Sequence, residues 1–193
     1  MGNTVYCEAV PSHVDFRRLD SIANVQIDLR YASANNFVGR DLYSPLDCAW
    51  LHRNAAEGLE KTFAWLSARR PDLRFLVLDA MRPQRVQEQL WEALQGTELQ
   101  MYLANPERGS IHSFGMAVDI TLIDGHSREL DMGTAFDDLT ELSHPAKEDE
   151  FLATGALTRQ QIDNRRLLRE AMKQGGFAGI NTDCLGGTGT VVS

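Results

Sequence analysis

Cysteine is scarce in this chain, and so are long apolar runs and basic charge. The 193 residues include 3 cysteines, Cys7, Cys48 and Cys184, at no recurring spacing, which argues against a disulfide framework or a CxxC zinc ribbon. No apolar run approaches the ~20 residues of a membrane-spanning helix. The N-terminus has no basic region followed by an apolar core. We therefore expect a cytoplasmic protein that does not associate with a membrane.

The charge balance is acidic. Lysine and arginine number 19 against 27 aspartates and glutamates, which gives a net charge of -8. Because proteins bind phosphate backbones through lysine and arginine, this balance argues against a nucleic-acid partner. A length of 193 residues is typical of one domain that buries roughly 70% of its unfolded surface. None of these quantities indicates an oligomeric state.

Hydrophobic periodicity and short β-prone runs predict three strands and three helices. Val25, Ile27 and Leu29 alternate with polar residues as in a half-buried strand, and Pro71 ends a helical pattern. The predicted strands are 25–29, 73–78 and 116–122, and the predicted helices are 49–69, 83–94 and 158–173. Residues 95–113 lack periodicity and indicate a long functional loop. Since these elements do not follow a regular βαβ repeat, we expect a single α+β domain.

The most informative segment is Ser110-Ile111-His112-Ser113-Phe114-Gly115-Met116-Ala117-Val118-Asp119. It places His112 on a loop and Asp119 on the next predicted strand, and Gly115 allows a sharp approach between them. An imidazole and a carboxylate can converge on one cation, and zinc takes such ligands at about 2.0–2.2 Å. The alternative, a hydrogen-bonded surface pair, is the more frequent role of these two residue types.

Further motifs occur in order along the chain. They are Leu29-Arg30-Tyr31-Ala32, Asn36-Phe37-Val38-Gly39, Asp79-Ala80-Met81-Arg82-Pro83, Met132-Gly133, Phe136-Asp137, Glu141-Leu142-Ser143-His144, Asn164-Arg165-Arg166-Leu167-Leu168 and Gly176-Phe177. With the His112/Asp119 segment they resemble the zinc D-alanyl-D-alanine dipeptidases of vancomycin resistance and peptidoglycan recycling. That family lies within the larger group of D,D-carboxypeptidase and hedgehog-like zinc proteins. The resemblance implies a central, mostly antiparallel sheet with flanking helices.

The resemblance implies a zinc site and a catalytic arginine. His112 and Asp119 would be ligands of one zinc ion, and Arg82 would hold the oxyanion that forms when water attacks the peptide carbonyl. A guanidinium aimed at developing negative charge lowers the barrier, and loss of such a donor typically costs several kcal/mol. Without the resemblance, Arg82 would be read as a surface residue at the start of a helix.

Three further residues would bind the substrate, a small D,D-dipeptide. Ser110 is suited to hydrogen-bond the terminal carboxylate, and Asp137 resembles the family's anchor for the free ammonium group. Tyr31 would line the pocket. The alternatives are a solvated loop serine, a surface or helix-capping aspartate, and a core tyrosine.

The resemblance breaks at the C-terminal end of the chain. The family places Glu-Trp-Trp-His shortly after the Gly-Phe pair, where Glu is the general base and His the third zinc ligand. This chain has Asp183-Cys184-Leu185-Gly186 there. Asp183 keeps a carboxylate and is the candidate base, whereas Gly186 cannot bind metal. Cys184 could coordinate as a thiolate, and His126 and His144 are other spare imidazoles.

The codons TGG TGG CAC for Trp-Trp-His, read one base later, encode Gly-Gly-Thr, which stands here at 186–188. We hypothesise that a small insertion or a sequencing error around 183–185 shifted the reading frame. The chain is therefore divided into a dipeptidase-like domain at 1–182 and an atypical Gly-rich tail at 183–193.

These observations predict an enzyme that hydrolyses D-alanyl-D-alanine to two D-alanines with one zinc ion per chain. Because a catalytic zinc normally has three protein ligands, we expect reduced activity from this sequence. Two alternatives stay open. One is a homologue that binds the dipeptide without catalysis, and the other is a related D,D-carboxypeptidase that acts on longer peptidoglycan stems.

Overall fold

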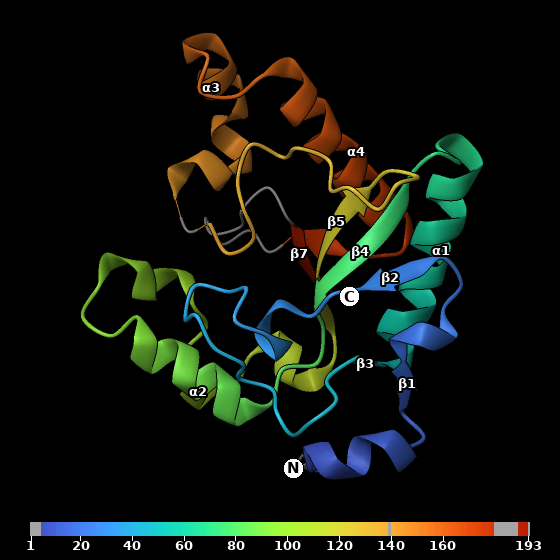
Figure 1. The fold of residues 1–193 in the computed structure, drawn as a ribbon, viewed down its shortest axis with the longest axis vertical. Helices are drawn as coiled ribbons and strands as arrows, with labels where there is room; N and C mark the ends of the chain where they lie inside the picture. The colour runs from blue at the N-terminus through green and yellow to red at the C-terminus, as the bar shows by residue number, and fades with distance from the viewer. Residues whose placement is uncertain (1–4, 139, 180–188, 193) are drawn as a thin grey trace.

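A five-stranded sheet forms the centre of the molecule (Figure 1). The computed structural model describes residues 5–138, 140–179 and 189–192. The order across the sheet is β2 (Val25–Ile27), β4 (Arg74–Asp79), β5 (Ala117–Ile123), β7 (Gly189–Val192) and β6 (Ala178–Gly179). Only the β2–β4 pair of this sheet is parallel. The prediction of an α+β domain with a mostly antiparallel sheet is therefore confirmed.

The remaining elements surround this sheet. A two-stranded antiparallel sheet pairs β1 (Phe16–Arg18) with β3 (Trp50–His52). The α-helices are α1 (Arg53–Arg69), α2 (Gln84–Ala93), α3 (Glu148–Thr154) and α4 (Arg159–Gln174). The 3-10 helices are η1 (Cys7–Ser12), η2 (Leu19–Ser21), η3 (Arg30–Ala32), η4 (Glu98–Tyr102), η5 (Pro106–Arg108), η6 (Ile111–Phe114), η7 (Glu141–Ser143) and η8 (Pro145–Lys147).

Helices α1 and α4 pack against each other and cover one face of the sheet (Figure 1). Leu59 and Phe63 of α1 and Leu168 of α4 join the side chains of β4 and β5 in the main core. The two helices approach closely at a glycine pair. A Cβ atom on Gly58 would lie 2.6 Å from the carbonyl oxygen of Gly175, so only glycine fits this contact.

The predicted strands and helices all form, with shifted boundaries. The helix expected from residue 49 begins at Arg53, because Trp50–His52 forms β3 and the His52 side chain accepts a hydrogen bond from Asn54 N. Helix α4 begins with a capping box formed by Thr158 and Gln161. Strands β1 and β3 and helix α3 were not predicted, since segments this short carry little periodic signal.

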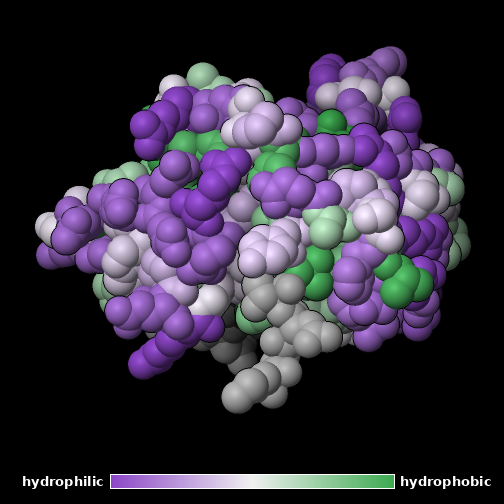
Figure 2. Space-filling view, turned by 90° about the horizontal axis from the view of Figure 1, so that it is seen from below, coloured by the Kyte–Doolittle hydropathy of each residue, from purple (hydrophilic) through white to green (hydrophobic). Residues whose placement is uncertain are grey.

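The surface is largely polar. On the face shown in Figure 2, hydrophilic residues predominate and hydrophobic residues form small separate patches. Within the described residues, no helix combines the length and the apolar composition that crossing a lipid bilayer requires.

The C-terminal tail lies partly outside the described residues. Its backbone at 189–192 forms β7, which pairs with β5 so that Asp119 lies opposite Thr190. Residues 180–188 lie outside the described part, and with them Asp183, Cys184 and Gly186.

Candidate active site

A β-bulge brings two carboxylates together at the centre of the sheet. In the β4–β5 pair, Val77 lies opposite Ile120, but the next paired residue of β4 is Asp79, opposite Asp119. The register therefore skips Leu78. Because directly paired residues point to the same face, this irregularity places the Asp79 side chain beside Asp119, on the face away from α1 and α4.

Helix η6, which comes just before β5 in the chain, places His112 beside Asp119 of that strand. Ser110 is its N-cap, with Oγ accepting a hydrogen bond from His112 N at 3.3 Å. Gly115 ends the helix with a φ of 66°, and a Cβ there would lie 2.8 Å from His52 N. Glycine alone meets both demands at low cost, which confirms the sharp approach predicted between His112 and Asp119.

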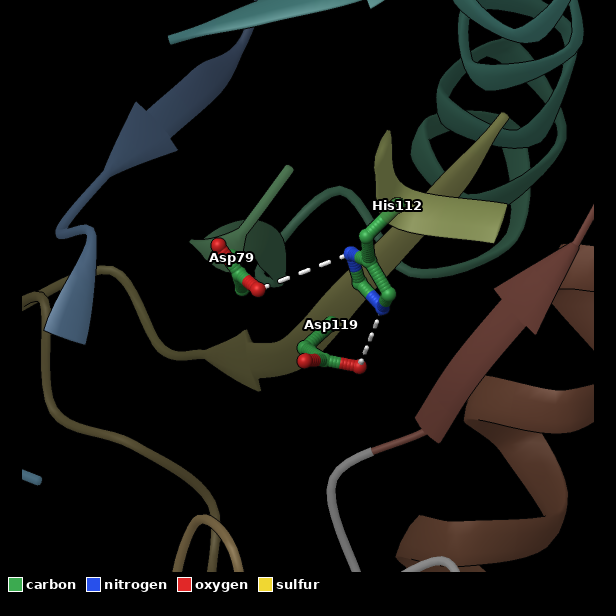
Figure 3. A group of neighbouring side chains, drawn as sticks. All are labelled: Asp79, His112 and Asp119. Carbon is green, nitrogen blue, oxygen red and sulfur yellow. Dashed lines mark ion pairs between the residues drawn. The ribbon is translucent and has the colours of Figure 1, made fainter. Parts of the chain in front are cut away.

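His112 presents one ring nitrogen to Asp119 (Figure 3). The Nδ1 atom lies 2.8 Å from the carbonyl oxygen of Ala80, a contact that places the proton on Nδ1. The Nε2 atom faces Asp119, whose Oδ1 lies 3.7 Å away. Two ligands of a tetrahedral metal with bonds of about 2.1 Å lie roughly 3.4 Å apart, so this pair fits the geometry of a metal site.

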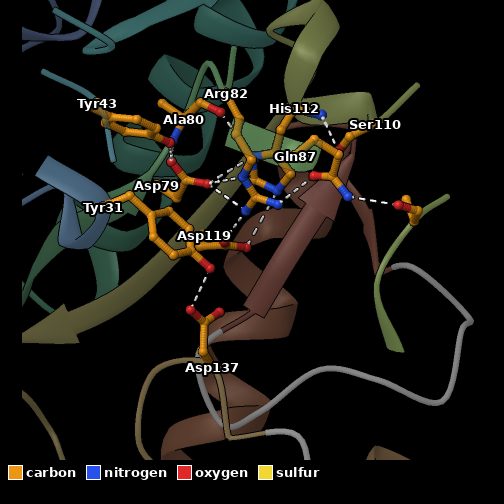
Figure 4. Close-up of polar contacts among 11 residues, drawn as sticks. Tyr31, Tyr43, Asp79, Ala80, Arg82, Gln87, Ser110, His112, Asp119 and Asp137 are labelled. Atoms are coloured by element: carbon orange, nitrogen blue, oxygen red, sulfur yellow. Dashed lines mark hydrogen bonds and ion pairs between the residues drawn. The ribbon is translucent and has the colours of Figure 1, made fainter. Parts of the chain in front are cut away.

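Asp79 completes a buried Asp–His–Asp group in which one ligand atom of each residue lies within 4.8 Å of the others. The oxygens of Asp79 are already engaged (Figure 4). Oδ1 accepts hydrogen bonds from Tyr43 Oη and Ala80 N, and Oδ2 accepts two from Arg82. Asp79 therefore organises its neighbours, and the atoms of the group that could hold a metal are His112 Nε2 and the Asp119 carboxylate.

Arg82 is a buried cation that Asp79 holds in place. Its Nε and Nη2 donate to Asp79 Oδ2 at 3.0 and 2.6 Å, and Nη1 donates to Gln87 Oε1 at 3.0 Å. The guanidinium also lies over the Tyr31 ring, 5.1 Å from its centroid. Burial opposes its charge, but Asp79 and the other neighbours hold the pKa of Arg82 well above its usual range. These bonds use three of its five N–H groups, and Nη2 also lies 3.6 Å from Asp119 Oδ2.

Asp137 joins this group through the hydroxyl of Tyr31 (Figure 4). Its Oδ2 accepts a hydrogen bond of 2.5 Å from Tyr31 Oη, and Tyr31 is buried. The backbone of Asp137 has a φ of 57°, a left-handed conformation that few side chains tolerate. The structure therefore links Tyr31 to both Asp137 and Arg82.

Two effects disfavour a negative charge on Asp137. Burial withdraws the carboxylate from water, and the nearby charge of Asp119 repels it, which together raise the pKa of Asp137 to about 7. The hydrogen bond from Tyr31 and the charge of Arg82 act in the opposite direction but do not cancel them. A cation that binds beside this carboxyl group stabilises its charged form.

The structure brings together six of the predicted site residues, Tyr31, Arg82, Ser110, His112, Asp119 and Asp137 (Figure 4). The metal-ligand group in the described part of the chain includes neither His126 nor His144. Arg82 is buried rather than on the surface, so its alternative interpretation as a surface residue is wrong. Asp183 lies outside the described residues, and its role stays a prediction.

Sequence reasoning missed Asp79, Tyr43 and Gln87. The sequence did carry a signal for Asp79, because it directly follows the apolar run 75–78. The structure shows that Asp79 is fully buried. An aspartate in that position requires several partners when buried. Tyr43 and Gln87 carry no local signal, because they reach the site from a turn and from α2.

Comparisons with known proteins agree with this geometry. A family model described as D-ala-D-ala dipeptidase, of the peptidase M15 group, matches residues 13–183. The D-alanyl-D-alanine dipeptidase of Escherichia coli (strain K12) is 36% identical over 160 residues, which cover 83% of this chain and 76% of that protein. The similarity therefore spans most of both chains.

A solved structure also resembles the fold. It is the LdcB LD-carboxypeptidase, described for its peptidoglycan recognition, with a TM-score of 0.51 and 14% identity. The match covers 93% of this chain and 68% of that one. At this identity it supports the fold alone. Peptidases of the M15 group are metallopeptidases, and the buried Asp–His–Asp group could bind a metal. From the family match and the dipeptidase relative, the chain belongs to the peptidase M15 family of D-Ala-D-Ala dipeptidases.

Proposed function

We propose that this protein is a zinc-dependent dipeptidase that hydrolyses D-alanyl-D-alanine to two D-alanines, as part of peptidoglycan precursor turnover or resistance. The single observation that carries the proposal is the facing pair of His112 Nε2 and Asp119 Oδ1, 3.7 Å apart, beside the buried Arg82. A 36% identical relative with the same named activity supports the choice of substrate. A cytoplasmic location stays a prediction from the sequence.

His112 and Asp119 would hold the zinc ion. When bound, zinc would polarise the scissile carbonyl and activate water. Arg82 would donate its remaining N–H groups to the oxygen on which negative charge develops. Because Arg82 is fixed by Asp79 and Gln87 before the substrate binds, this stabilisation needs no reorganisation.

The other residues would bind the two ends of the dipeptide. The Ser110 hydroxyl accepts from His112 N and can still donate its proton to the terminal carboxylate. Asp137 would bind the free ammonium group, with Tyr31 packed beside it. An N-acylated peptide offers no ammonium group, so this contact would favour free dipeptides over longer stems.

Activity would be reduced relative to an intact family site. The sequence has Gly186 where the third zinc ligand is expected, and Asp183 is one methylene shorter than the expected glutamate. Two ligands predict weak zinc binding and a poorly activated water. Asp183 is the proposed proton acceptor that would transfer the proton to the leaving amine.

The test is the release of D-alanine from D-alanyl-D-alanine in the presence of zinc. We expect slow release that a chelator abolishes and that His112→Gln removes. The matched control is His126→Gln, because His126 is an exposed histidine outside the site and its replacement is expected to leave the rate unchanged. A folded protein that binds the dipeptide but releases no D-alanine would be a binding homologue. Faster cleavage of an N-acylated peptide would instead indicate a D,D-carboxypeptidase.

A further inference from the structure

Arg165 lies buried on α4, and its side chain contacts the segment that carries Asp137. Only 2% of the residue is exposed. Its Nε donates to Met132 O at 2.6 Å, and its Nη1 donates to Leu142 O at 2.9 Å. Nη2 donates to Thr134 Oγ1 at 3.2 Å. One guanidinium thus bonds both ends of the segment 132–142, and Asp137 lies midway between those ends.

Glu148 offsets part of the charge of Arg165 inside the protein, although burial lowers the pKa of Arg165. Glu148, itself 4% exposed, places Oε1 3.8 Å from Arg165 Nη1. Arg169 holds the same carboxylate with two bonds of 2.7 Å. Because Glu148 is fixed by Arg169, it supplies a counter-charge without drawing the Arg165 N–H groups away from the segment. Burying these charges costs free energy of desolvation. Buried ionic groups can in turn fix one defined geometry of the groups around them.

The segment needs support at the position of Asp137. The residue has a φ of 57° and a carboxylate whose negative charge is disfavoured by burial. Both features cost free energy and persist only when the surroundings enforce them. Neighbouring α4 side chains add to the support at one end, where Asn164 Nδ2 and Gln161 Nε2 donate to Asp131, each at 2.8 Å.

We propose that Arg165 is a positioning residue for the ammonium subsite: it holds the segment 132–142 so that Asp137 faces Tyr31 and can receive the dipeptide's free amine. This inference rests on the proposed function, in which Asp137 binds that amine. Arg165 touches neither substrate nor metal in this account. Its planar fork of donors suits three acceptors in fixed directions, whereas the single ammonium of a lysine cannot reproduce them.

The test compares two ligands in Arg165→Lys and in the wild type. Calorimetry in the presence of zinc gives the dissociation constants of D-alanyl-D-alanine and of N-acetyl-D-alanyl-D-alanine, which lacks the ammonium group. In Arg165→Lys we expect binding of the free dipeptide to weaken at least about tenfold while binding of the acetylated one stays the same. Arg166→Lys is the matched control, because Arg166 is the next residue of α4 and is exposed. This variant is expected to prefer the free dipeptide over the acetylated one as strongly as the wild type does.

A double variant separates positioning from a general loss of stability. Asp137→Asn alone is expected to remove the preference for the free dipeptide. If Arg165 acts through Asp137, the variant Asp137→Asn/Arg165→Lys binds the free dipeptide no more weakly than Asp137→Asn does. If Arg165→Lys does not fold, Thr134→Val removes one of the three contacts and is expected to lower the preference in the same direction, by less.

The outcomes distinguish this inference from the proposed function. A wild type that prefers the free dipeptide, with Arg165→Lys keeping that preference, overturns the positioning role and leaves the dipeptidase proposal standing. Equal weakening of both ligands in Arg165→Lys also overturns it, since the effect is then not specific to the amine. A wild type without preference, unchanged in Asp137→Asn, overturns the ammonium subsite itself and the inference with it.

Discussion

The two sides of the candidate site are built in different ways. On the strand side, Asp79 and Asp119 are placed by backbone pairing and a bulge, and His112 by a capped helical turn. On the loop side, Asp137 lies on an irregular segment held by α4 side chains that bond its carbonyl groups. A sheet fixes its side chains through many backbone bonds at once, whereas a loop depends on a few contacts that single substitutions can remove.

The largest expected effect lies on the strand side. Asp79→Asn removes the charge that compensates buried Arg82, and the free energy of unfolding is expected to fall by about 3–5 kcal/mol. Urea denaturation measures it. The control is Glu60→Gln, which breaks a surface pair with Arg17 and is expected to cost less than about 1 kcal/mol. Similar losses in both variants would contradict the organising role of Asp79.

The loop side is expected to respond to Gly133→Ala. Gly133 has a φ of 79°, and a Cβ there would lie 2.4 Å from Leu157 Cδ2. We expect a loss of about 1–3 kcal/mol in the free energy of unfolding, together with weaker binding of the free dipeptide. Gly125→Ala is the control, because a Cβ at Gly125 meets nothing within 4 Å. Unchanged dipeptide binding in Gly133→Ala would show that the segment tolerates displacement.

The loop side should also give binding a pH dependence. With the pKa of Asp137 at about 7, the carboxylate gains its charge as pH rises from about 6 to about 7.5, so affinity for the free dipeptide is expected to rise about fivefold, until the dipeptide's own ammonium group loses its proton near pH 8. Asp137→Asn should abolish the rise. Calorimetry at several pH values measures it, with the acetylated dipeptide as the control ligand. A rise that persists in Asp137→Asn would assign the titration to another group.

The same carboxyl predicts the sign of a stability change. Its pKa is raised in the folded state, so the native protein binds more protons than the unfolded chain between about pH 4 and about pH 7. This contribution to stability is complete below that window and is lost as pH rises through about 7. The stability of the wild type relative to Asp137→Asn should therefore be highest below about pH 4 and should fall as pH rises to about 7. Urea denaturation of both proteins at several pH values measures this fall.

The smallest effect is expected from Tyr31→Phe. The change removes the hydroxyl that donates to Asp137 and should cost about 1 kcal/mol of unfolding free energy. Because this hydrogen bond lowers the pKa of Asp137, its loss should raise that pKa further. A carbon-13 NMR titration of the carboxyl follows the shift. Tyr6→Phe, at an exposed tyrosine, should change neither quantity.

Much of the fold could be predicted from the sequence. Strands β4 and β5 are continuous apolar runs and helices α1 and α4 carry apolar periodicity, and each forms near its predicted position. Short β1 and β3 could not be predicted, because tertiary pairing rather than local pattern defines a three-residue strand. The 3-10 helices η4, η5 and η6, which begin within 95–113, escaped because about one turn of helix is too short to show an apolar periodicity.

Some site residues could likewise be predicted from the sequence, and others could not. His112 and Asp119 lie close in sequence and could be paired from their spacing, with Gly115 as the turn. Asp79 could not be placed beside Asp119, because that neighbourhood depends on a bulge between distant strands. The contacts of Arg165 were likewise beyond reach, since a helix contacts the carbonyl groups of a segment more than 20 residues earlier in the chain.

The most direct test is the coupling between zinc and the dipeptide. If the strand side holds zinc and the loop side holds the ammonium group of one substrate, zinc should strengthen binding of D-alanyl-D-alanine, and the dipeptide should strengthen zinc binding by the same factor. Calorimetric titrations in both orders measure the two factors. Equal dipeptide affinity with and without zinc would contradict the account, because the two sides would then not form one site.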